Sequence, residues 1–332
     1  MGSRILKTRA RIIGTGSYVP EKILTNADLE KFVDTSDEWI RTRTGICQRH
    51  IAAEDEQTSD LASKAAQAAL DMAGVTAEEI DLLIVGTITG DCPWPATACL
   101  VQEKIGAKNA WAYDISAACS GFVYSLDAAT RQIEAGAIQK ALVIGAEILT
   151  RFIDWTDRNT CVLFGDAAGA VVLEAQETES GVLSTHLHSD GSYYELLYQP
   201  GFGSVHPPSE EGLKNRVPYL SMQGNEVFKV AVRSLYNVAV ECLEANNMSV
   251  ADLDLFIPHQ ANIRILDAAA KRLGLSEEQT YINVERLGNT SAATIPVALD
   301  EANRAGRIKE GDLLMFDAFG GGFTWGAALV RW

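Results

Sequence analysis

Asp81-Leu-Leu-Ile-Val-Gly-Thr87 is a short apolar run, and Asp254-Leu-Phe-Ile-Pro-His-Gln260 repeats its pattern in the second half of the chain. A short apolar run after a helical pattern and an acidic turn predicts a buried strand. Because the two runs share this context, the sequence predicts a duplicated fold. We place one half in residues 1–175 and the other in residues 176–332.

A second pair of segments supports the duplication. Ala135-Gly136 before Ala141-Leu-Val-Ile144 resembles Ala305-Gly306 before Leu313-Leu-Met-Phe316, at nearly the same offset along the chain as the first pair. Helical patterns lie between the strands, and the one over 120–135 has apolar residues on one face. Alternating strands and helices predict an α/β protein with largely parallel sheets that helices cover on both sides.

Composition and charge exclude several classes of protein. The 332 residues are 47% hydrophobic, which is enough for a substantial core. The net charge of −16 argues against nucleic acid as the main partner, because phosphate binding needs a basic surface. No run of 18 apolar residues and no signal-like N-terminal segment occurs, so we expect a cytoplasmic protein that does not enter a membrane.

Metal and nicotinamide sites are not expected. The six cysteines include no CxxC pair. His186 and His188 form an HxH pair, but the sequence indicates no carboxylate or cysteine partner for them, so we expect no metal. No GxGxxG segment opens a helix after a strand, which disfavours a dinucleotide-binding enzyme.

Cys119 is the candidate nucleophile. It lies in Ala117-Ala-Cys-Ser-Gly-Phe122, where small residues mark a strand-to-helix turn of the kind that exposes a nucleophile in hydrolases. The N-terminus of the following helix is expected to lower the pKa of the thiol. Most cysteines are small buried residues instead, and we assign that role to Cys99, Cys161 and Cys242.

His259 and Asn289 are candidates from the second half. His259 follows a strand that Pro258 ends, and Asn289 follows a glycine, where a turn or a helix N-cap would explain it equally well. Ligands in α/β sheets bind beyond the carboxyl ends of strands. A two-fold arrangement would therefore bring Cys119, His259 and Asn289 together, although they lie far apart in the sequence.

Gly320-Gly-Gly-Phe-Thr-Trp-Gly326 lies between two predicted strands. Its free backbone N–H groups would be able to stabilise an oxyanion, or the segment is only a tight hairpin.

Together these segments resemble the β-ketoacyl-acyl-carrier-protein synthase III family. The likeness runs from about Ile12 to Trp332, with the motifs in the family's order. It implies an α/β thiolase fold of two duplicated halves, with mainly parallel central sheets sandwiched by helices. The motifs that carry it are Asp34-Thr-Ser-Asp-Glu-Trp-Ile40, Thr42-Arg-Thr-Gly45, Ala118-Cys-Ser-Gly-Phe122, Phe164-Gly-Asp-Ala-Ala-Gly169, Pro258-His-Gln-Ala-Asn262, Gly288-Asn-Thr-Ser291 and the glycine-rich segment.

The resemblance implies a role for each candidate. Cys119 takes the acyl group from an acyl-CoA, while His259 and Asn289 stabilise the enolate formed when malonyl-acyl carrier protein loses carbon dioxide. The backbone amides of Cys119 and Gly321 form the oxyanion hole. Relatives that elongate chains use a second histidine, so Asn289 indicates the initiating type. No cofactor is implied, because the CoA thioester is itself the substrate.

The resemblance also implies two sets of binding residues. The residues resembling those that hold CoA are Trp39, Arg43, Arg158 and Asn262. The acidic carrier protein would dock on a basic face formed by Lys229, Arg264, Lys271 and Arg272. The last three are spaced by about two helical turns and so share a helix face, although an ordinary solvated face has the same spacing.

Trp94 is the candidate gauge of primer length. In the family the matching position lies at the floor of the partner's acyl pocket, so an indole there implies a short primer such as acetyl or propionyl. This role of Trp94 requires a homodimer, to which residues 96–105 would contribute. The alternative is that Trp94 only seals the dimer contact.

Other functions are also compatible with this sequence. The siblings are a thiolase-fold synthase of secondary metabolism and a hydroxymethylglutaryl-CoA synthase. A papain-like cysteine protease has the same Cys–His–Asn order and a similar spacing, but its cysteine lies near the mature N-terminus, whereas Cys119 lies far inside this chain, and no disulfide setting exists. A degenerate subunit without activity should have lost its nucleophile, and this chain retains all three groups.

Overall fold

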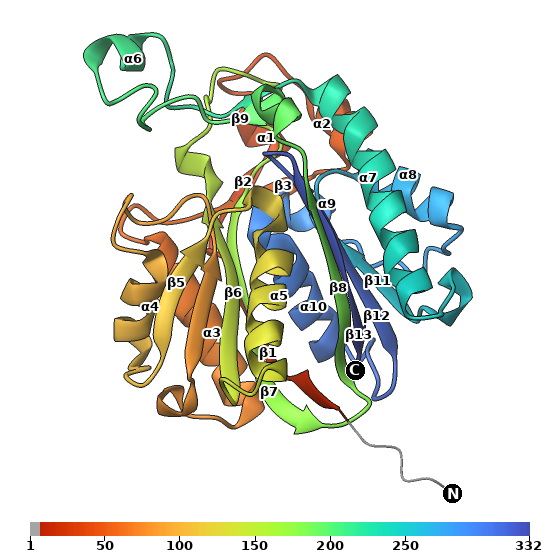
Figure 1. The fold of residues 1–332 in the computed structure, drawn as a ribbon. Helices are drawn as coiled ribbons and strands as arrows, with labels where there is room; N and C mark the ends of the chain where they lie inside the picture. The colour runs from red at the N-terminus through yellow and green to blue at the C-terminus, as the bar shows by residue number, and fades with distance from the viewer. Residues whose placement is uncertain (1–6) are drawn as a thin grey trace, which may run out of the picture.

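A computed structural model describes residues 7–332, and two large β-sheets form its frame (Figure 1). The first sheet has the order β1-β7-β6-β4-β5 and the second has the order β11-β12-β13-β8. The strands are β1 (Thr8–Tyr18), β4 (Leu82–Gly86), β5 (Trp111–Ile115), β6 (Lys140–Ile148), β7 (Asp166–Glu177), β8 (Gly181–Ser189), β11 (Leu255–Pro258), β12 (Leu313–Gly320) and β13 (Thr324–Arg331).

Each sheet has one strand that runs against the others. β7 is antiparallel to both β1 and β6, whereas β6, β4 and β5 pair in parallel. β13 is antiparallel to both β12 and β8, whereas β11 and β12 pair in parallel. All strands but β7 and β13 therefore share the direction of their sheet, which confirms the predicted mainly parallel sheets.

The two halves repeat the same path. The first residues of β4 and β11 are separated by the same number of positions as the two apolar runs of the sequence. The first residues of β6 and β12 are separated by this number as well. The order β1-β7-β6-β4 corresponds to β8-β13-β12-β11. For the domain boundary we propose the link between β7 and β8, slightly beyond position 175, because this keeps β7 whole.

Two central helices separate the sheets (Figure 1). They are α5 (Gly121–Glu134) and α10 (Thr294–Arg304). Their first residues are separated by the same number of positions as those of β4 and β11. Phe122 and Leu126 of α5 and Leu299 of α10 are fully buried in one cluster with Ile84 of the first sheet and Phe316 of the second. Burying each such side chain contributes about 1.5–3 kcal/mol. α5 confirms the helix predicted over 120–135.

Four outer helices cover the remaining faces of the sheets (Figure 1). α3 and α4 pack on the first sheet, and α7 and α8 on the second. Gly16 of β1 lets α3 approach, because a Cβ there would lie 2.3 Å from the Ala65 carbonyl oxygen. Gly14-Thr-Gly16 is thus a packing feature. The bounds are α3 (Thr58–Ala73), α4 (Thr97–Ile105), α7 (Gly224–Ala245) and α8 (Ile263–Leu273).

Shorter elements surround one end of the sheets, and the segment around α6 projects from the body (Figure 1). None of the helices formed by residues 7–332 combines the length and apolar character that a membrane crossing requires. The remaining bounds are β2 (Lys22–Thr25), α1 (Asn26–Leu29), α2 (Asp37–Thr44), β3 (Gln48–Ile51), β9 (Leu197–Tyr198), α6 (Glu210–Lys214), β10 (Ser221–Met222) and α9 (Val284–Leu287), with 3-10 turns η1 (Ala77–Glu79), η2 (Ala118–Ser120), η3 (Leu149–Arg151), η4 (Gly191–Leu196), η5 (Val250–Asp252) and η6 (Ser291–Ala293).

Candidate active site

Cys119 lies in the tight turn η2 between β5 and α5, as the sequence predicted. The terminal hairpin β12–β13 fixes this turn, because Ser120 Oγ donates to the Thr324 carbonyl (3.0 Å) and Thr324 Oγ1 donates to the Ala117 carbonyl (2.8 Å). Gly320 touches the nucleophile directly, since a Cβ at this position would lie 2.6 Å from the Cys119 nitrogen. The glycine-rich segment is therefore packed against the nucleophile turn.

The thiol of Cys119 is more basic than we predicted. Burial raises its pKa to about 12, because a thiolate at this position loses its contact with water. The side chain of Ser291 acts in the opposite direction and lowers the pKa, but this effect is smaller than that of burial. The expectation that the helix N-terminus lowers the pKa is therefore wrong for the free protein, and acyl transfer needs a group that accepts the proton.

His259 follows β11 and is held on two sides. Its backbone N–H donates to the Asp317 carbonyl (2.7 Å), and its Nδ1 lies 2.7 Å from Thr294 Oγ1. The residue is only 4% exposed. Burial lowers the pKa of His259 to about 3, because the imidazolium would lose its hydration. The imidazole is thus neutral at physiological pH and has one nitrogen left for a substrate.

Asn289 is held by both backbone and side chain. It forms a parallel bridge with Phe164, in which its N–H donates to the Leu163 carbonyl (2.8 Å) and its carbonyl accepts from Gly165 N–H (3.1 Å). Its Oδ1 accepts a hydrogen bond from Ser291 N–H (2.8 Å). Since the amide oxygen is occupied, Nδ2 is the group that Asn289 offers to a ligand as a donor.

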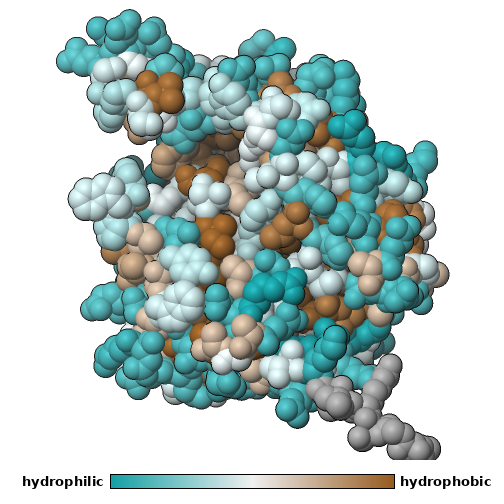
Figure 2. Space-filling model, viewed as in Figure 1, coloured by the Kyte–Doolittle hydropathy of each residue, from teal (hydrophilic) through white to brown (hydrophobic). Residues whose placement is uncertain are grey.

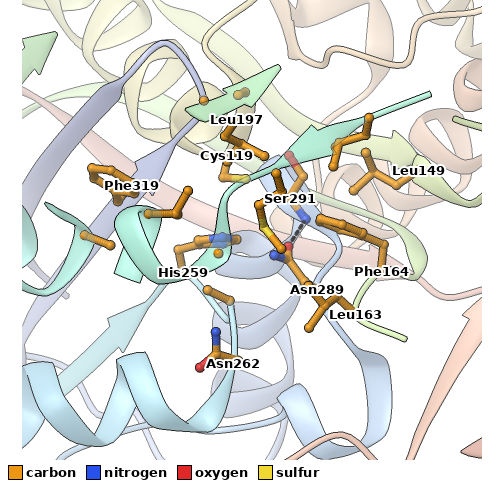
Figure 3. Close-up of a pocket in the computed structure, with 18 of the residues that line it drawn as sticks. Cys119, Leu149, Leu163, Phe164, Leu197, His259, Asn262, Asn289, Ser291 and Phe319 are labelled. Atoms are coloured by element: carbon orange, nitrogen blue, oxygen red, sulfur yellow. Dashed lines mark hydrogen bonds between the residues drawn. The ribbon is translucent and has the colours of Figure 1, made fainter. Parts of the chain in front are cut away.

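Cys119, His259, Asn289 and Gly321 line one cavity of about 720 Å³. Figure 3 shows the first three side chains approaching one another from different elements, with Ser291 between them. The face in Figure 2 is hollowed beneath the projecting α6 segment, where hydrophobic residues are visible. Apolar side chains in the cavity wall include Leu149, Phe152, Val162, Leu163, Phe164, Leu197, Leu220, Val227, Leu235 and Phe319.

The residues predicted to bind CoA gather at the edge of this cavity. Trp39 has the guanidinium of Arg43 4.7 Å and that of Arg158 5.1 Å from its ring centre. Trp39, Arg43 and Asn262 line the cavity, whereas Arg158 does not line it and donates to the Asp34 carbonyl (2.9 Å). Asn262 also caps α8, because its side chain accepts from Ile265 N–H.

The predicted basic face spans α7 and α8. Arg264 lines the cavity, and its guanidinium lies 5.5 Å from the Phe228 ring. Arg272 lies at the other end of α8, 4.2 Å from the Tyr236 ring, and Lys229 pairs with Glu226 (2.8 Å). Lys271 is exposed on α8 next to Arg272. Trp94, in contrast, is 83% exposed and does not line the cavity of its own chain.

Sequence reasoning missed three polar residues behind the site. Glu147 is fully buried and bonds to Ser291 Oγ (3.0 Å), and Thr294 Oγ1 donates to the Ser291 carbonyl (2.9 Å). A signal for Glu147 was present, because it is a charged residue within an apolar strand. Ser291 and Thr294 lie in or just after the motif that contains Asn289 but carry no signal of their own.

The histidine pair on β8 differs from its prediction. Glu241 of α7 bonds to both rings, with distances of 3.1 Å to His186 Nδ1 and 2.7 Å to His188 Nε2. A carboxylate partner is therefore present, contrary to our expectation. The described part of the chain nevertheless contains no group of three or more His, Cys, Asp or Glu side chains arranged to hold a metal ion.

Asp317 is fully buried, and neither of its carboxyl oxygens has a hydrogen-bond partner among residues 7–332. Burial raises its pKa well above the ordinary value of 3.8. Between pH 3.8 and the raised pKa of Asp317, the unfolded chain has released the proton while the folded chain keeps it. The free energy of unfolding therefore falls by up to about 1.4 kcal/mol per pH unit. We expect Asp317→Asn to unfold in denaturant like the wild type at pH 4 and to be more stable at pH 8.

Asp267→Asn, the same change at an exposed position of α8, is the control for this experiment. Equal pH dependence of the unfolding free energy in wild type and Asp317→Asn would contradict the prediction.

Comparisons with known proteins show which family the chain resembles. Residues 113–191 match the family described as 3-oxoacyl-[acyl-carrier-protein (ACP)] synthase III, and residues 243–332 match its C-terminal part. A β-ketoacyl-[acyl-carrier-protein] synthase III of Xanthomonas campestris pv. campestris is 57% identical over 328 residues, 97% of this chain and 98% of that protein.

Solved structures show the same likeness. The 3-oxoacyl-[acyl-carrier-protein] synthase III of Aquifex aeolicus VF5 superposes with a TM-score of 0.91 at 49% identity, covering 97% of this chain and 100% of that one. The priming β-ketosynthase of the R1128 polyketide pathway superposes with a TM-score of 0.90 at 34% identity, covering 100% and 99%.

The duplicated fold, with a cysteine, a histidine and an asparagine in one cavity between its halves, defines a thiolase-fold condensing enzyme, an acyltransferase. The relatives make the assignment specific, since they are similar over nearly the whole chain. The chain belongs to the β-ketoacyl-acyl-carrier-protein synthase III family, and it is an initiating condensing enzyme of fatty acid synthesis.

Proposed function

We propose that the enzyme condenses a short acyl-CoA with malonyl-acyl carrier protein to give a 3-oxoacyl-acyl carrier protein through an acyl-Cys119 intermediate. The observation that carries the proposal is the meeting of Cys119, His259 and Asn289 in one cavity. The reaction requires no separate cofactor, because the thioester activates the acyl group and decarboxylation supplies the carbon nucleophile. We place it in the cytoplasm, where both thioesters are made.

In the first half-reaction, the sulfur of Cys119 attacks the acyl carbonyl and CoA leaves. The carbonyl oxygen becomes negative, and the backbone N–H groups of Cys119 and Gly321 are the proposed donors to it. Both residues line the cavity, and the contact of Gly320 with Cys119 keeps the two backbone segments adjacent. Trp39 with its two arginines is the proposed holder of the CoA adenine, by stacking and cation–π contact.

In the second half-reaction, malonyl-acyl carrier protein loses carbon dioxide and an enolate oxygen becomes negative. Asn289 Nδ2 is one proposed donor to this oxygen, since its Oδ1 is already occupied. His259 Nε2 is the other proposed donor. This role requires the Thr294 hydroxyl to turn its single proton from the Ser291 carbonyl to Nδ1, so that the imidazole proton is on Nε2. A neutral imidazole suits this step, because an imidazolium would protonate the carbon nucleophile.

Mass spectrometry of Cys119 tests the proposal. Incubation with acetyl-, propionyl- and octanoyl-CoA should give a short-chain adduct on Cys119, and addition of malonyl-acyl carrier protein should remove it as a 3-oxoacyl product. Release with acetoacetyl-CoA as the second substrate, or with no carrier protein, would favour a sibling synthase instead. Cleavage of a peptide library would support the protease alternative, and we expect none.

The basic face on α7 and α8 is the proposed dock for the acidic carrier protein. We expect Arg264→Glu to raise the KM for malonyl-acyl carrier protein by roughly 10-fold, a loss of about 1.4 kcal/mol, because the reversed charge repels the carrier. The effect should weaken at high salt. Steady-state kinetics with each substrate varied in turn measures it.

Lys309→Glu is the matched control for the docking prediction. Lys309 is exposed and precedes β12, at the end of this strand opposite to Gly320 and the site. The Lys309→Glu change should leave the KM values for acyl-CoA and malonyl-acyl carrier protein unchanged. An equal rise for acyl-CoA and malonyl-acyl carrier protein in Arg264→Glu would count against the docking surface.

A homodimer is the proposed assembly, with the first sheet continuing across the interface. In one chain β5 is an edge strand and its Trp111 is 47% exposed, while Trp94 on the nearby loop is 83% exposed. An edge strand has unpaired backbone N–H and C=O groups that can pair with another chain. Residues 96–105 contain α4, which lies beside β5, and belong to the proposed contact region.

Trp94 is the proposed gauge of primer length in the partner's pocket. Overpacking by extra methylene groups costs roughly 1–3 kcal/mol. The wild type should therefore prefer acetyl-CoA over octanoyl-CoA in kcat/KM, and Trp94→Ala should reduce this preference. Sedimentation at micromolar concentration has to show a dimer for both proteins. An unchanged ranking of the two substrates, or an active monomer, would remove this role for Trp94.

A further inference from the structure

Glu147 is a buried carboxyl group directly behind the nucleophile, and the mechanism above does not use it. It lies near the end of β6 and is fully buried. Its Oε2 accepts hydrogen bonds from Thr89 Oγ1 (2.5 Å) and Thr87 Oγ1 (3.2 Å), and Ile88 N–H donates to the same oxygen (3.2 Å). Its Oε1 accepts from Ser291 Oγ (3.0 Å).

Neutral dipoles, rather than a cation, stabilise this carboxylate. The groups that act on it come from the β4–α4 loop (Thr87, Ile88 and Thr89) and from η6 (Ser291), and none of them is charged. Cys119 of η2 is the titratable group that senses its charge. Burial raises the pKa of Glu147 to about 7, so both protonation states are populated near neutral pH. A proton acceptor works best with such a pKa.

Ser291 connects Glu147 with the rest of the site. Its side-chain hydroxyl bonds to Glu147 and acts on the Cys119 thiol. Its backbone contacts the residues around Asn289 and His259. Its N–H donates to Asn289 Oδ1, and its carbonyl accepts from Thr294, the partner of His259. The residue adopts a left-handed conformation with φ of 50°, which is uncommon for a residue with a side chain. In this conformation the side chain of Ser291 contacts Glu147, while its backbone contacts Asn289 and Thr294.

Acyl transfer requires a proton acceptor that the three motif residues do not supply. The buried thiol of Cys119 holds its proton strongly. His259 is a poor base, since its pKa is lowered to about 3. Asn289 does not titrate. The side chain of Ser291 acts on the thiol, and its hydroxyl donates to the Glu147 carboxylate (3.0 Å).

We propose that Glu147, acting through the hydroxyl of Ser291, accepts the proton of Cys119 during acyl transfer. The thiol proton moves to Ser291 Oγ while the proton of this hydroxyl moves to Glu147 Oε1. The Cys119 sulfur bonds to the acyl carbon, and the bond between this carbon and the CoA sulfur breaks. The proton then returns along the same path to the CoA sulfur, so the products are acyl-Cys119 and CoA thiol. This inference rests on the acyl transfer proposed above.

Two variants separate the proton path from the rest of the site. Ser291→Gly removes the hydroxyl but keeps the backbone N–H and carbonyl that hold Asn289 and Thr294, and glycine readily adopts the positive φ. Glu147→Gln keeps the size of the side chain but cannot accept the proton. Rapid-quench measurement of Cys119 acetylation by acetyl-CoA between pH 6 and pH 9 is the assay, with malonyl decarboxylation measured in parallel.

We expect both variants to slow acetylation at pH 7 by about 10²-fold or more, as for the loss of a positioned general base. The wild-type rate should fall below about pH 7 as Glu147 takes up its proton, whereas both variants should lose this limb and accelerate only at alkaline pH. In Ser291→Gly decarboxylation should fall by far less than acetylation, because the backbone groups that hold Asn289 and Thr294 remain.

Thr87→Val gives a test that does not depend on removing either group. The Thr87 hydroxyl lowers the pKa of Glu147, so its loss should move the acidic limb of the acetylation profile to higher pH, and Thr87→Ser should restore it. Wild-type acetylation rates in Glu147→Gln, or an unmoved profile in Thr87→Val, would overturn the inference. A wild type that forms no acyl-Cys119 would instead overturn the proposed function.

Discussion

Cys119→Ala should lose condensation on the order of 10⁶-fold, as enzymes with covalent catalysis do when the nucleophile is removed, and yet continue to decarboxylate malonyl-acyl carrier protein. The loss follows because no acyl-enzyme can form. The retained activity follows because the enolate donors do not depend on Cys119. Asn289 is held by Leu163, Gly165 and Ser291, and the partner of His259 is Thr294.

Release of carbon dioxide and formation of the 3-oxoacyl product, measured on the same samples, separate the two steps. Cys242→Ala is the control, since Cys242 is buried in α7, away from the cavity lining, and should leave both steps near wild type. Full condensation by Cys119→Ala would show that the mechanism is wrong. The wild type should also show ping-pong kinetics, because CoA leaves before the second substrate reacts.

Labelling with iodoacetamide distinguishes an active enzyme from an inactive scaffold. Cys92 is exposed and would react first, so the experiment needs a Cys92→Ser background. In that background Cys119 should be alkylated slowly, because burial raises the pKa of its thiol to about 12. Acyl-CoA should block the reaction. Alkylation at Cys119 that acyl-CoA does not affect would count against the proposed intermediate.

The sequence was sufficient for the fold because duplication leaves a pattern along the chain. The offset between two apolar runs reappears between β4 and β11, α5 and α10, and β6 and β12. Cys119, His259 and Asn289 were predicted as a group because each lies where a predicted strand or turn ends. The strand ends of such sheets meet at one edge. Their roles came from the resemblance and not from the pattern.

The environment of these residues was not predictable in the same way. The direction of the Cys119 pKa shift depends on how completely the terminal hairpin and η6 bury the thiol, and these segments are distant in sequence. The contact of Glu147 with Ser291 likewise joins residues from different halves of the chain. A helix N-terminus is visible in a sequence, whereas the loss of water around a thiol appears only when both halves are assembled.

His259→Ala should have the opposite effect to Cys119→Ala. Cys119 should still be acylated near the wild-type rate, because a histidine whose pKa is lowered to about 3 does not take the thiol proton. Decarboxylation and condensation should fall by about 10²–10³-fold, the usual cost of one lost donor to a developing oxyanion. Mass spectrometry of acyl-Cys119 and release of carbon dioxide from malonyl-acyl carrier protein measure the two steps.

The pH dependence of decarboxylation gives a sharper version of this prediction. Burial keeps His259 neutral, so decarboxylation by the wild type should show no histidine ionisation between pH 5 and pH 8. His259→Gln, which places an amide donor near the position of Nε2, should recover part of the rate that His259→Ala loses, and His186→Ala on β8 should change nothing. If His259→Ala instead slowed acylation and left decarboxylation intact, His259 would be the base for Cys119, and the division of labour between the two half-reactions would have to be reversed.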